Sequence, residues 1–398
     1  MRIIELFAGI GACSKALENI GIDLEIVDTV EIDKYAIKSF NAIHNTNFKA
    51  RDISKYNEFY KDIDIITHGS PCQDFSIAGK QEGGDKGSGT RSSLMYETIR
   101  IVEQIKPKYI LWENVKNVLS KKHKHNFDNY INTLDSLGYN SYYKILNAKD
   151  YGVPQNRERV FTVSIRKDID PGSFNFPKKQ ILKLRLKDIL ENEVDEKYYL
   201  SEEVASKYVQ SKENNTNVIG NLIMDKWQDS MKRIYDIEKY SPAINTMQGG
   251  NLEPKIITQQ EEKILINNNT KKGYDEAVEG DSVNLQYPNS KTRRGRVGHQ
   301  VSQTLMAKGE MGVIEKNLEY RIRKLTPREC WRLMGFNDND FEKVANIPMS
   351  NAQLYKQAGN SIVVKVLEKI FANLFKTVAN VNHNQEILAN GQTSMFMS

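Results

Sequence analysis

Short apolar runs alternate with amphipathic stretches over the first part of the chain, a pattern typical of an α/β fold. The apolar runs predict strands at 3–6, 24–30, 63–67, 108–115 and 160–165, and a further short strand at 46–50. Residues 12–20 place Ala16, Leu17 and Ile20 on one helical face, and Gly21 supplies a helix stop. We therefore expect a doubly wound, mostly parallel sheet.

The α/β rhythm fades from about residue 185 to residue 345. Polar breaks at 214–217 and 267–272 are typical of loops. A weak internal echo relates 241–250 to 302–309, and an apolar pair follows each copy. The pattern predicts a smaller, irregular, β-rich domain built from glycine-bearing units.

The chain is therefore expected to contain two domains, the first of them discontinuous. The expected segments are the first part of the sheet domain (1–184), the β-rich domain with a hinge (185–345), a return segment that completes the sheet domain (346–382) and a polar tail (383–398). Within the return segment, 357–375 is expected to form a helix.

Composition narrows the class of protein. The 398 residues are 39% hydrophobic and carry a formal net charge of +5, which permits a polyanionic partner without requiring one. No apolar run approaches the roughly 20 residues of a membrane helix, and no targeting segment is recognised, so a cytoplasmic protein without a membrane partner is expected. The three cysteines are far apart and form no Cys-x-x-Cys pair, which disfavours a disulfide framework and a metal site.

Two strand ends carry candidate catalytic side chains. Cys72 follows the strand at 63–67 in a small-residue turn, and Glu113 lies near the end of the strand at 108–115. Ligands collect at the carboxyl edge of an open parallel sheet, so Cys72 suits a nucleophile and Glu113 a partly desolvated hydrogen-bond donor. The alternatives are a buried structural cysteine and an acid that caps the next helix.

The turn after the first strand is suited to a nucleoside ligand. Gly9 and Gly11 let the backbone approach a ligand closely, and Glu31 lies about 20 residues later, where it can accept from ribose hydroxyls. The third glycine of a dinucleotide fingerprint is replaced by Ser14, which disfavours NAD and FAD. Asp52 can accept from an adenine amino group or cap a helix, and a tight turn without a ligand stays possible at the glycines.

Arg157 and Arg159 alternate in an extended segment before the strand at 160–165. Two neighbouring guanidinium groups suit an anion or a carbonyl oxygen. A solvated sheet edge is the alternative.

Six motifs now stand in one order along the chain, and together they resemble the DNA cytosine-5 methyltransferases. The motifs are the glycine turn (7–11), Gly69-Ser70-Pro71-Cys72-Gln73, Glu113-Asn114-Val115, Gln155-Asn156-Arg157-Glu158-Arg159, the segment 323–330 and the segment 357–362. The resemblance implies a cofactor domain and a target recognition domain, with double-stranded DNA between them.

The resemblance also implies a mechanism. Cys72 would add to C6 of a flipped cytosine, and S-adenosyl-L-methionine would supply the methyl group for C5 and leave as S-adenosyl-L-homocysteine, with no metal. Glu113 would contact N3 and the amino group. Arg159 would hold the O2 oxygen, and Arg157 would support the loop.

The resemblance implies the binding residues one by one. The cofactor would lie against Phe7, Gly9, Gly11, Glu31, Ile32, Asp52, Ile53, Pro71, Leu94, Asn360 and Ser361. Ile32 departs from the family pattern, which commonly has a larger side chain there. DNA would contact Gln73, Ser76, Lys80, Lys86, Arg91, Arg293, Arg294, Arg296, Thr304 and Leu305, with Thr246 as a competitor for the Thr-Leu role.

Several alternatives stay open beside this expectation. Transfer RNA could replace DNA as the substrate, or the fold could serve a catalytically silent DNA-binding regulator. A nicotinamide oxidoreductase is disfavoured by Ser14. A monomer is expected, and a companion restriction endonuclease acting on the same site is possible.

Overall fold

The structure, a computed structural model, describes residues 1–71, 84–85, 87–211, 216–247, 251–261, 264–277, 281–284, 297–299, 311–313 and 318–376. Contacts divide the chain into two compact units. Unit 1 comprises Met1–Val194, Asp236–Pro254 and Leu325–Ser398, and unit 2 comprises Asp195–Tyr235 and Lys255–Lys324. No helix in the described ranges is long and apolar enough to cross a bilayer.

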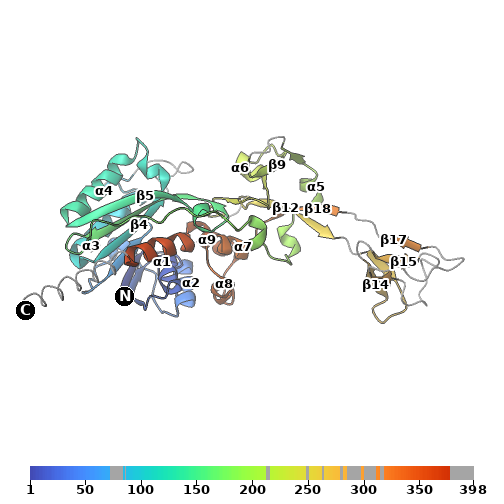
Figure 1. Ribbon diagram of the computed structural model, residues 1–398, viewed down its shortest axis with the longest axis horizontal. Coiled ribbons are helices and arrows are strands. Elements are labelled where there is room, and N and C mark those ends of the chain that lie inside the picture. The colour runs from blue at the N-terminus through green and yellow to red at the C-terminus, as the bar shows by residue number, and fades with distance from the viewer. Residues whose placement is uncertain are drawn as a thin grey trace, which may run out of the picture. The chain divides into compact units, whose positions relative to one another are not determined.

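Unit 1 is built on a six-stranded mixed sheet (Figure 1). In spatial order its strands are β2 (Glu25–Val30), β1 (Arg2–Leu6), β3 (Ile65–His68), β4 (Tyr109–Val115), β7 (Glu158–Arg166) and β5 (Tyr139–Asn147). The first four are parallel, and β7 runs antiparallel to both of its neighbours. The chain passes from β1 outward to β2 and then returns to the other side of β1 at β3. This reversal is the topological switch point at which open α/β sheets bind ligands.

Helices cover both faces of this sheet, which confirms the expected α/β fold. Ile66 and Ile110 pack with apolar side chains of α3 (Met95–Ile105) and α4 (Lys124–Ser136) on one face. On the other face, the ring of Tyr109 meets Phe375 of the helix at 364–376 edge-on, with ring centroids 5.8 Å apart. The apolar runs form strands because both of their faces are buried.

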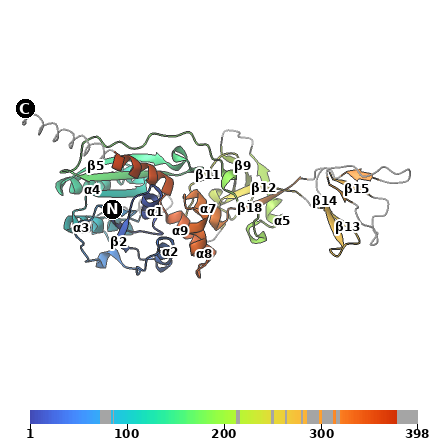
Figure 2. The same ribbon diagram turned by 60° about the horizontal axis from the view of Figure 1, so that its bottom comes forward.

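The remaining helices of unit 1 are short. They are α1 (Ala12–Asn19), α2 (Lys34–His44), α7 (Pro327–Leu333), α8 (Asp338–Ala345), α9 (Asn351–Asn360) and the 3₁₀ turns η1 (Ile53–Lys55), η2 (Arg91–Leu94), η3 (Lys116–Leu119), η4 (Ala148–Tyr151) and η5 (Leu186–Ile189). Figure 2 shows α7 and α8 near α9 in this unit.

Two expected elements of unit 1 are wrong. Residues 46–50 form no strand, because Asn41 replaces a neighbouring strand as their partner: its side chain accepts from the Phe48 amide and donates to the Phe48 carbonyl. The expected helix at 357–375 is interrupted at residues 361–363. The carbonyls of Gly359 and Ser361 at this break accept hydrogen bonds from Arg157.

The contact division also differs from the expected boundaries near 185 and 345. Residues 325–345 lie in unit 1, where Thr326 and Glu329 form a capping box and Pro327 begins α7. The Tyr355 hydroxyl of α9 donates to the Leu325 carbonyl at 2.6 Å. These bonds fasten the segment to the return helix rather than to the β-rich unit.

Residues 236–254, which contain the first copy of the internal echo, also belong to unit 1. There β11 (Ser241–Pro242) pairs in parallel with β6 (Gln155–Asn156), just before β7. The second copy, at 302–309, lies outside the described residues, so the echo is not tested as a structural repeat.

Unit 2 is β-rich and irregular, as expected. Its five-stranded sheet has the order β18 (Leu318–Lys324), β12 (Lys255–Glu261), β10 (Arg233–Tyr235), β9 (Val218–Leu222) and β8 (Tyr208–Gln210). Its smaller elements are β13 (Ile264–Asn267), β14 (Tyr274–Ala277), β15 (Ser282–Asn284), β16 (Val297–Gly298), β17 (Met311–Val313), α5 (Glu202–Ala205), α6 (Asp229–Lys232) and η6 (Glu196–Tyr198). A small core of Leu222, Ile234 and Ile322 holds the main sheet together.

A carboxyl group lies in the core of unit 1, under the first turn of α1. Glu5 in β1 is only 2% exposed, and its Oε1 accepts from the Ser14 backbone N–H at 2.8 Å. Burial raises the pKa of Glu5, although the Ser14 hydrogen bonds and the charge of His44 oppose that shift. The helix start is therefore tied to the sheet through a side chain that is costly to ionise.

Glu5→Gln tests this cost. A buried group whose pKa is raised contributes stability that is present below its ordinary pKa and is lost as the pH rises through the folded-state value. The substituted amide side chain keeps an acceptor for the Ser14 amide and never ionises. As the pH rises above the ordinary pKa of a glutamate, the free energy of unfolding of the parent should therefore fall more than that of E5Q, by about 1.4 kcal/mol for each unit of pKa elevation. Urea unfolding at several pH values measures the difference, and parallel pH profiles would contradict the account.

Candidate active site

Three of the four parallel strands of unit 1, β2, β1 and β3, end level with one another, beside Trp112 of β4, which continues to Val115. Val30, Leu6, His68 and Trp112 are successive cross-strand partners in β2, β1, β3 and β4. The next residue on each strand is respectively Glu31, Phe7, Gly69 and Glu113. The sheet register therefore brings three of the predicted motifs and Glu31, which are far apart in the sequence, to one edge at the switch point.

The turn after β1 has an unusual backbone. Phe7, Gly9 and Gly11 have φ values of 53°, 56° and 83°, all in the left-handed region that glycine adopts most readily. A Cβ on Gly11 would lie 2.2 Å from Nε2 of His44, so the space for a side chain is already filled. Gly9, in contrast, meets nothing within 4 Å. The turn is thus packed on its protein side and open at Gly9.

Glu31 is held against this turn by backbone amides. Its Oε2 accepts from the Gly9 N–H at 2.9 Å, and its Oε1 accepts from the Asp33 N–H at 2.8 Å. Burial raises the pKa of Glu31, and these two hydrogen bonds oppose that shift. The adjacent Ile32 is 71% exposed, which is unusual for a large apolar side chain. A carboxylate acceptor and an apolar surface therefore stand side by side.

The other predicted cofactor residues have varied environments. Asp52 caps η1 through hydrogen bonds from the Ser54 amide and hydroxyl, which lower the pKa of Asp52, and Ile53 is buried. Leu94 ends η2 and packs against the core, whereas Asn360 is exposed at the end of α9. The capping alternative for Asp52 is thus realised, which does not test its role toward adenine.

The last motif is anchored beside Glu31. Lys356 of α9 pairs with Asp33 at 2.7 Å, and Gln357 donates to the Tyr35 carbonyl and accepts from the Ser39 hydroxyl. These bonds place α9 against the start of α2. The C-terminal motif is therefore near the turn that carries Glu31 and Ile32.

The turn that leads to Cys72 is clamped from β4. Ser70 is 3% exposed, and its Oγ accepts from the indole N–H of Trp112 at 3.0 Å. The side-chain amide of Asn114 also donates to the Ser70 carbonyl at 3.3 Å. Beneath them His68 stacks on Trp112 and shares a 2.8 Å hydrogen bond with the Tyr130 hydroxyl, and burial lowers the pKa of His68 to about 3. His68 is therefore a neutral part of the core.

Glu113 and Arg159 form a partly buried ion pair near the end of β4. Nε of Arg159 lies 3.2 Å from Oε1 of Glu113, but the N–H is poorly aligned for a hydrogen bond, so the attraction is chiefly electrostatic. Burial raises the pKa of Glu113, and the positive charges of Arg159 and Arg157 oppose that shift. A protonated Glu113 can donate to a ligand nitrogen, while Arg159 can hold an oxygen beside it.

Arg157 has a different task from Arg159. It is 4% exposed and donates to the carbonyls of Ile244, Gly359 and Ser361 at 2.8, 3.1 and 2.9 Å. A Cβ on Gly359 would lie 2.1 Å from the Asn245 carbonyl oxygen, so these backbones touch. Arg157 therefore joins three separate stretches of the chain.

Many of the predicted DNA-contacting residues, together with the predicted nucleophile, lie outside the described residues: Cys72, Gln73, Ser76, Lys80, Lys86, Arg293, Arg294, Arg296, Thr304 and Leu305. Arg91 is described and is exposed at the start of η2. Thr246 is described in unit 1, next to the Asn245–Gly359 contact.

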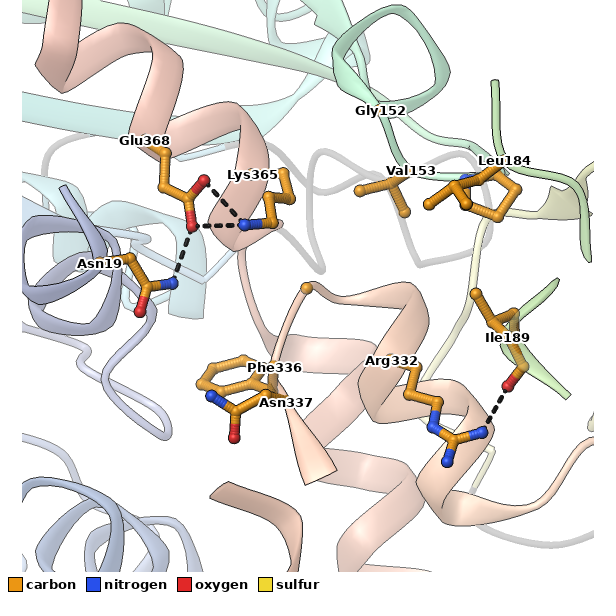
Figure 3. Close-up of a pocket in the computed structure, with 12 residues that line it drawn as sticks. Asn19, Gly152, Val153, Leu184, Ile189, Arg332, Phe336, Asn337, Lys365 and Glu368 are labelled. Carbon is orange, nitrogen blue, oxygen red and sulfur yellow. Dashed lines mark hydrogen bonds and ion pairs between the residues drawn. The ribbon is translucent and has the colours of Figure 1, made fainter. Parts of the chain in front are cut away.

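A cavity of about 430 Å³ lies elsewhere in unit 1 (Figure 3). Its polar side chains are already paired: Lys365 and Asn19 bind Glu368, and Arg332 binds the Ile189 carbonyl. None of the predicted site residues lines it. The strand edge is therefore a better candidate for the chemistry than this cavity.

Sequence reasoning missed two supports of the site. From the sequence, Trp112 is expected only to be a core residue of an apolar strand. Gln155 is expected only as part of a motif, yet its side chain donates to the Leu333 carbonyl at 2.8 Å. The one available signal was the position of Trp112 beside Glu113, because the N–H of a buried indole usually has a hydrogen-bond partner.

The chain is similar to known methyltransferases over most of its length. A family model described as C-5 cytosine-specific DNA methylase matches residues 1–376. An orphan methyltransferase of Bacillus phage SPbeta is 35% identical, with 96% of this chain and 98% of that protein covered. The type II methyltransferase M.HhaI of Haemophilus parahaemolyticus is 32% identical, with 94% of each covered. Among solved structures, the Dnmt2 methyltransferase of S. pombe shares the fold with a TM-score of 0.63 at 20% identity, covering 95% of this chain and 99% of that one.

The Trp112–Ser70 hydrogen bond can be tested by a double-mutant cycle. Trp112→Phe removes the donor and keeps an aromatic ring, and Ser70→Ala removes the acceptor. Each change should lower the free energy of unfolding by roughly 1 kcal/mol or more, and the double variant should lose less than the sum of the two, with a coupling of about 0.5–1.5 kcal/mol. Urea unfolding measures all four proteins. Strict additivity would mean that this bond does not hold the turn.

Proposed function

We propose, on the premise that the chain belongs to the C-5 cytosine-specific DNA methylase family, that it methylates C5 of a cytosine within a short recognition sequence of double-stranded DNA. One observation carries the proposal: the register that aligns Glu31, Phe7, Gly69 and Glu113 at one sheet edge. The nucleoside-binding and catalytic motifs of the family thereby converge on one site.

The first step belongs to Cys72, three residues beyond Gly69. Its thiolate adds to C6 of a cytosine flipped out of the duplex, so a C6–S bond forms and the C5=C6 double bond opens. Glu113, whose pKa is raised by burial, donates a proton to N3 as charge develops on the ring. Arg159 holds O2 and keeps the base oriented next to Glu113.

The opened ring has enamine character at C5, which makes that carbon a nucleophile. When bound, S-adenosyl-L-methionine supplies an electrophilic methyl group and leaves as S-adenosyl-L-homocysteine. A base, water included, then removes the C5 proton, the C5=C6 bond re-forms, N3 returns its proton to Glu113, and Cys72 leaves as a thiolate. Arg157 takes no part in these steps but positions the strand that bears Arg159.

The described residues fit this cofactor. The open space at Gly9 admits a ligand close to the backbone, and each Glu31 oxygen, with two lone pairs and one backbone donor, has capacity for a ribose hydroxyl. Exposed Ile32 offers an apolar surface for the adenine, with Asp52 and Ile53 at its edge. Phe7, Gly11, Pro71, Leu94, Asn360 and Ser361 would complete the site.

Recognition of the DNA is assigned to unit 2 and to the loop after Cys72. We assign phosphate or base contacts to Gln73, Ser76, Lys80, Lys86 and Arg91 in the loop, and to Arg293, Arg294, Arg296, Thr304 and Leu305 in unit 2. The support is the motif order for the loop and the basic composition of residues 291–296.

The names of the relatives indicate the general biological setting. The Bacillus phage relative is named an orphan methyltransferase, and the Haemophilus relative is named a type II methyltransferase. We propose a cytoplasmic monomer that protects DNA in a phage or a restriction-modification system. A companion endonuclease would be detected as a nuclease that this methylation blocks.

Bisulfite sequencing of DNA from cells that express the chain tests the proposal. Methylated cytosines should appear in one short sequence context, and Cys72→Ala should abolish them, because no other group is assigned to attack C6. Incubating the purified enzyme with labelled methyl donor and either duplex DNA or transfer RNA separates the two substrate classes. Methylation by C72A, or methylation of transfer RNA alone, would contradict the proposal.

A further inference from the structure

The segment that follows β4 carries a concentrated positive charge. Residues 116–125 contain four lysines and two histidines, and no acidic residue occurs between Glu113 and Asp128. The whole chain carries a formal net charge of only +5, so this cluster is a local feature. Lys116, Lys121, Lys122, Lys124 and His125 are all exposed.

The cluster adjoins the candidate active site. β4 ends at Val115, η3 begins at Lys116, and α4 begins at Lys124, so the charged segment starts three residues after Glu113. Lys116 pairs with Glu158 at 3.0 Å, and Glu158 precedes Arg159 in β7. The segment is therefore continuous with the sheet edge at which a flipped base would be held.

The local helix does not favour these cations. α4 has no acidic residue in its first turn and no side-chain hydrogen bond at its N-cap, His123. The N-terminus of a helix carries a partial positive charge, so nearby lysines are unfavourable. Burial and the charges of Lys122 and His125 lower the pKa of His123, as expected in a positive field. Within residues 114–127 no acidic side chain offsets this charge.

Ion pairs within the protein neutralise only part of the positive charge of this segment. Lys124 pairs with Asp128, and His125 lies 2.6 Å from Asp85. Lys121 and Lys122 have no ion pair with any residue that the structure describes. Two exposed lysines, eight and nine residues after Glu113 in the chain, are therefore available to an external polyanion.

We propose that Lys121 and Lys122 bind the sugar-phosphate backbone of duplex DNA beside the flipped cytosine. The inference rests on the proposed function and adds a contact surface in unit 1 to the loop and to unit 2. Duplex DNA presents about one phosphate per 3.4 Å along each strand, so neighbouring lysines can each neutralise one. The lysines read no sequence, and they increase affinity and fix the register of the duplex on the sheet edge.

The test is the salt dependence of duplex binding by the full chain, with S-adenosyl-L-homocysteine present. The variants are K121Q/K122Q and a matched control, K61Q/K106Q. Lys61 and Lys106 are also exposed, but they precede β3 and β4 at the opposite edge of the same sheet. Both variants lose two charges. Fluorescence anisotropy gives the association constant over a range of salt concentrations, for a duplex with the mapped site and one without it.

For K121Q/K122Q, the slope of log K against log salt should fall in magnitude by about 1.8, since each phosphate contact contributes about 0.9. Affinity should fall roughly tenfold or more at about 0.1 M salt, equally for both duplexes, while affinity for the cofactor stays constant. The control should match the parent. An unchanged slope in K121Q/K122Q, or an equal change in the control, would overturn the inference. A change seen with transfer RNA and not with duplex DNA would do the same.

These outcomes are separable from failure of the proposed function. If the parent methylates duplex DNA and K121Q/K122Q keeps the parental slope, only the surface assignment fails. If the parent neither methylates nor binds duplex DNA, the proposed function itself fails.

Discussion

The common register of four parallel strands is the constraint on which the rest of this site depends. Since Val30, Leu6, His68 and Trp112 are successive cross-strand partners, the residues that follow them must emerge at one edge. A slip of one residue in any strand would turn its side chains to the opposite face. The aligned edge then sets the electrostatics, because burial at the end of β4 raises the pKa of Glu113 beside the positive Arg159.

This edge is stabilised from distant parts of the chain. Arg157 binds carbonyls of Ile244, Gly359 and Ser361, so three stretches of sequence meet at one buried guanidinium. An unpaired charge at that depth would be costly, and the three acceptors offset the desolvation. The same arrangement explains why residues 236–254 and 325–376 fold with the sheet, although the sequence around them is that of the β-rich unit.

Much of the sheet and of its functional edge could be predicted from the sequence alone. Continuous apolar runs locate β1, β2, β3, β4 and β7, and the motifs locate their ends. The prediction failed where side chains replace backbone partners. Asn41 satisfies the backbone at Phe48, so no strand forms there, and Arg157 takes the carbonyls at the helix break after Asn360. The Trp112–Ser70 bond was missed for a similar reason, since a single indole donor leaves no periodic signal.

The most direct test is covalent capture of the enzyme on a duplex that bears 5-fluorocytosine at the mapped site, with S-adenosyl-L-methionine present. Fluorine at C5 replaces the proton that a base must remove, so elimination of Cys72 is blocked and the C6–S bond should persist through denaturation. The account predicts an adduct whose modified peptide contains Cys72. Cys13 and Cys330 are buried, and burial raises the pKa of both thiols well above the ordinary range. No adduct from an enzyme that methylates the ordinary duplex, or an adduct at either of those cysteines, would contradict it.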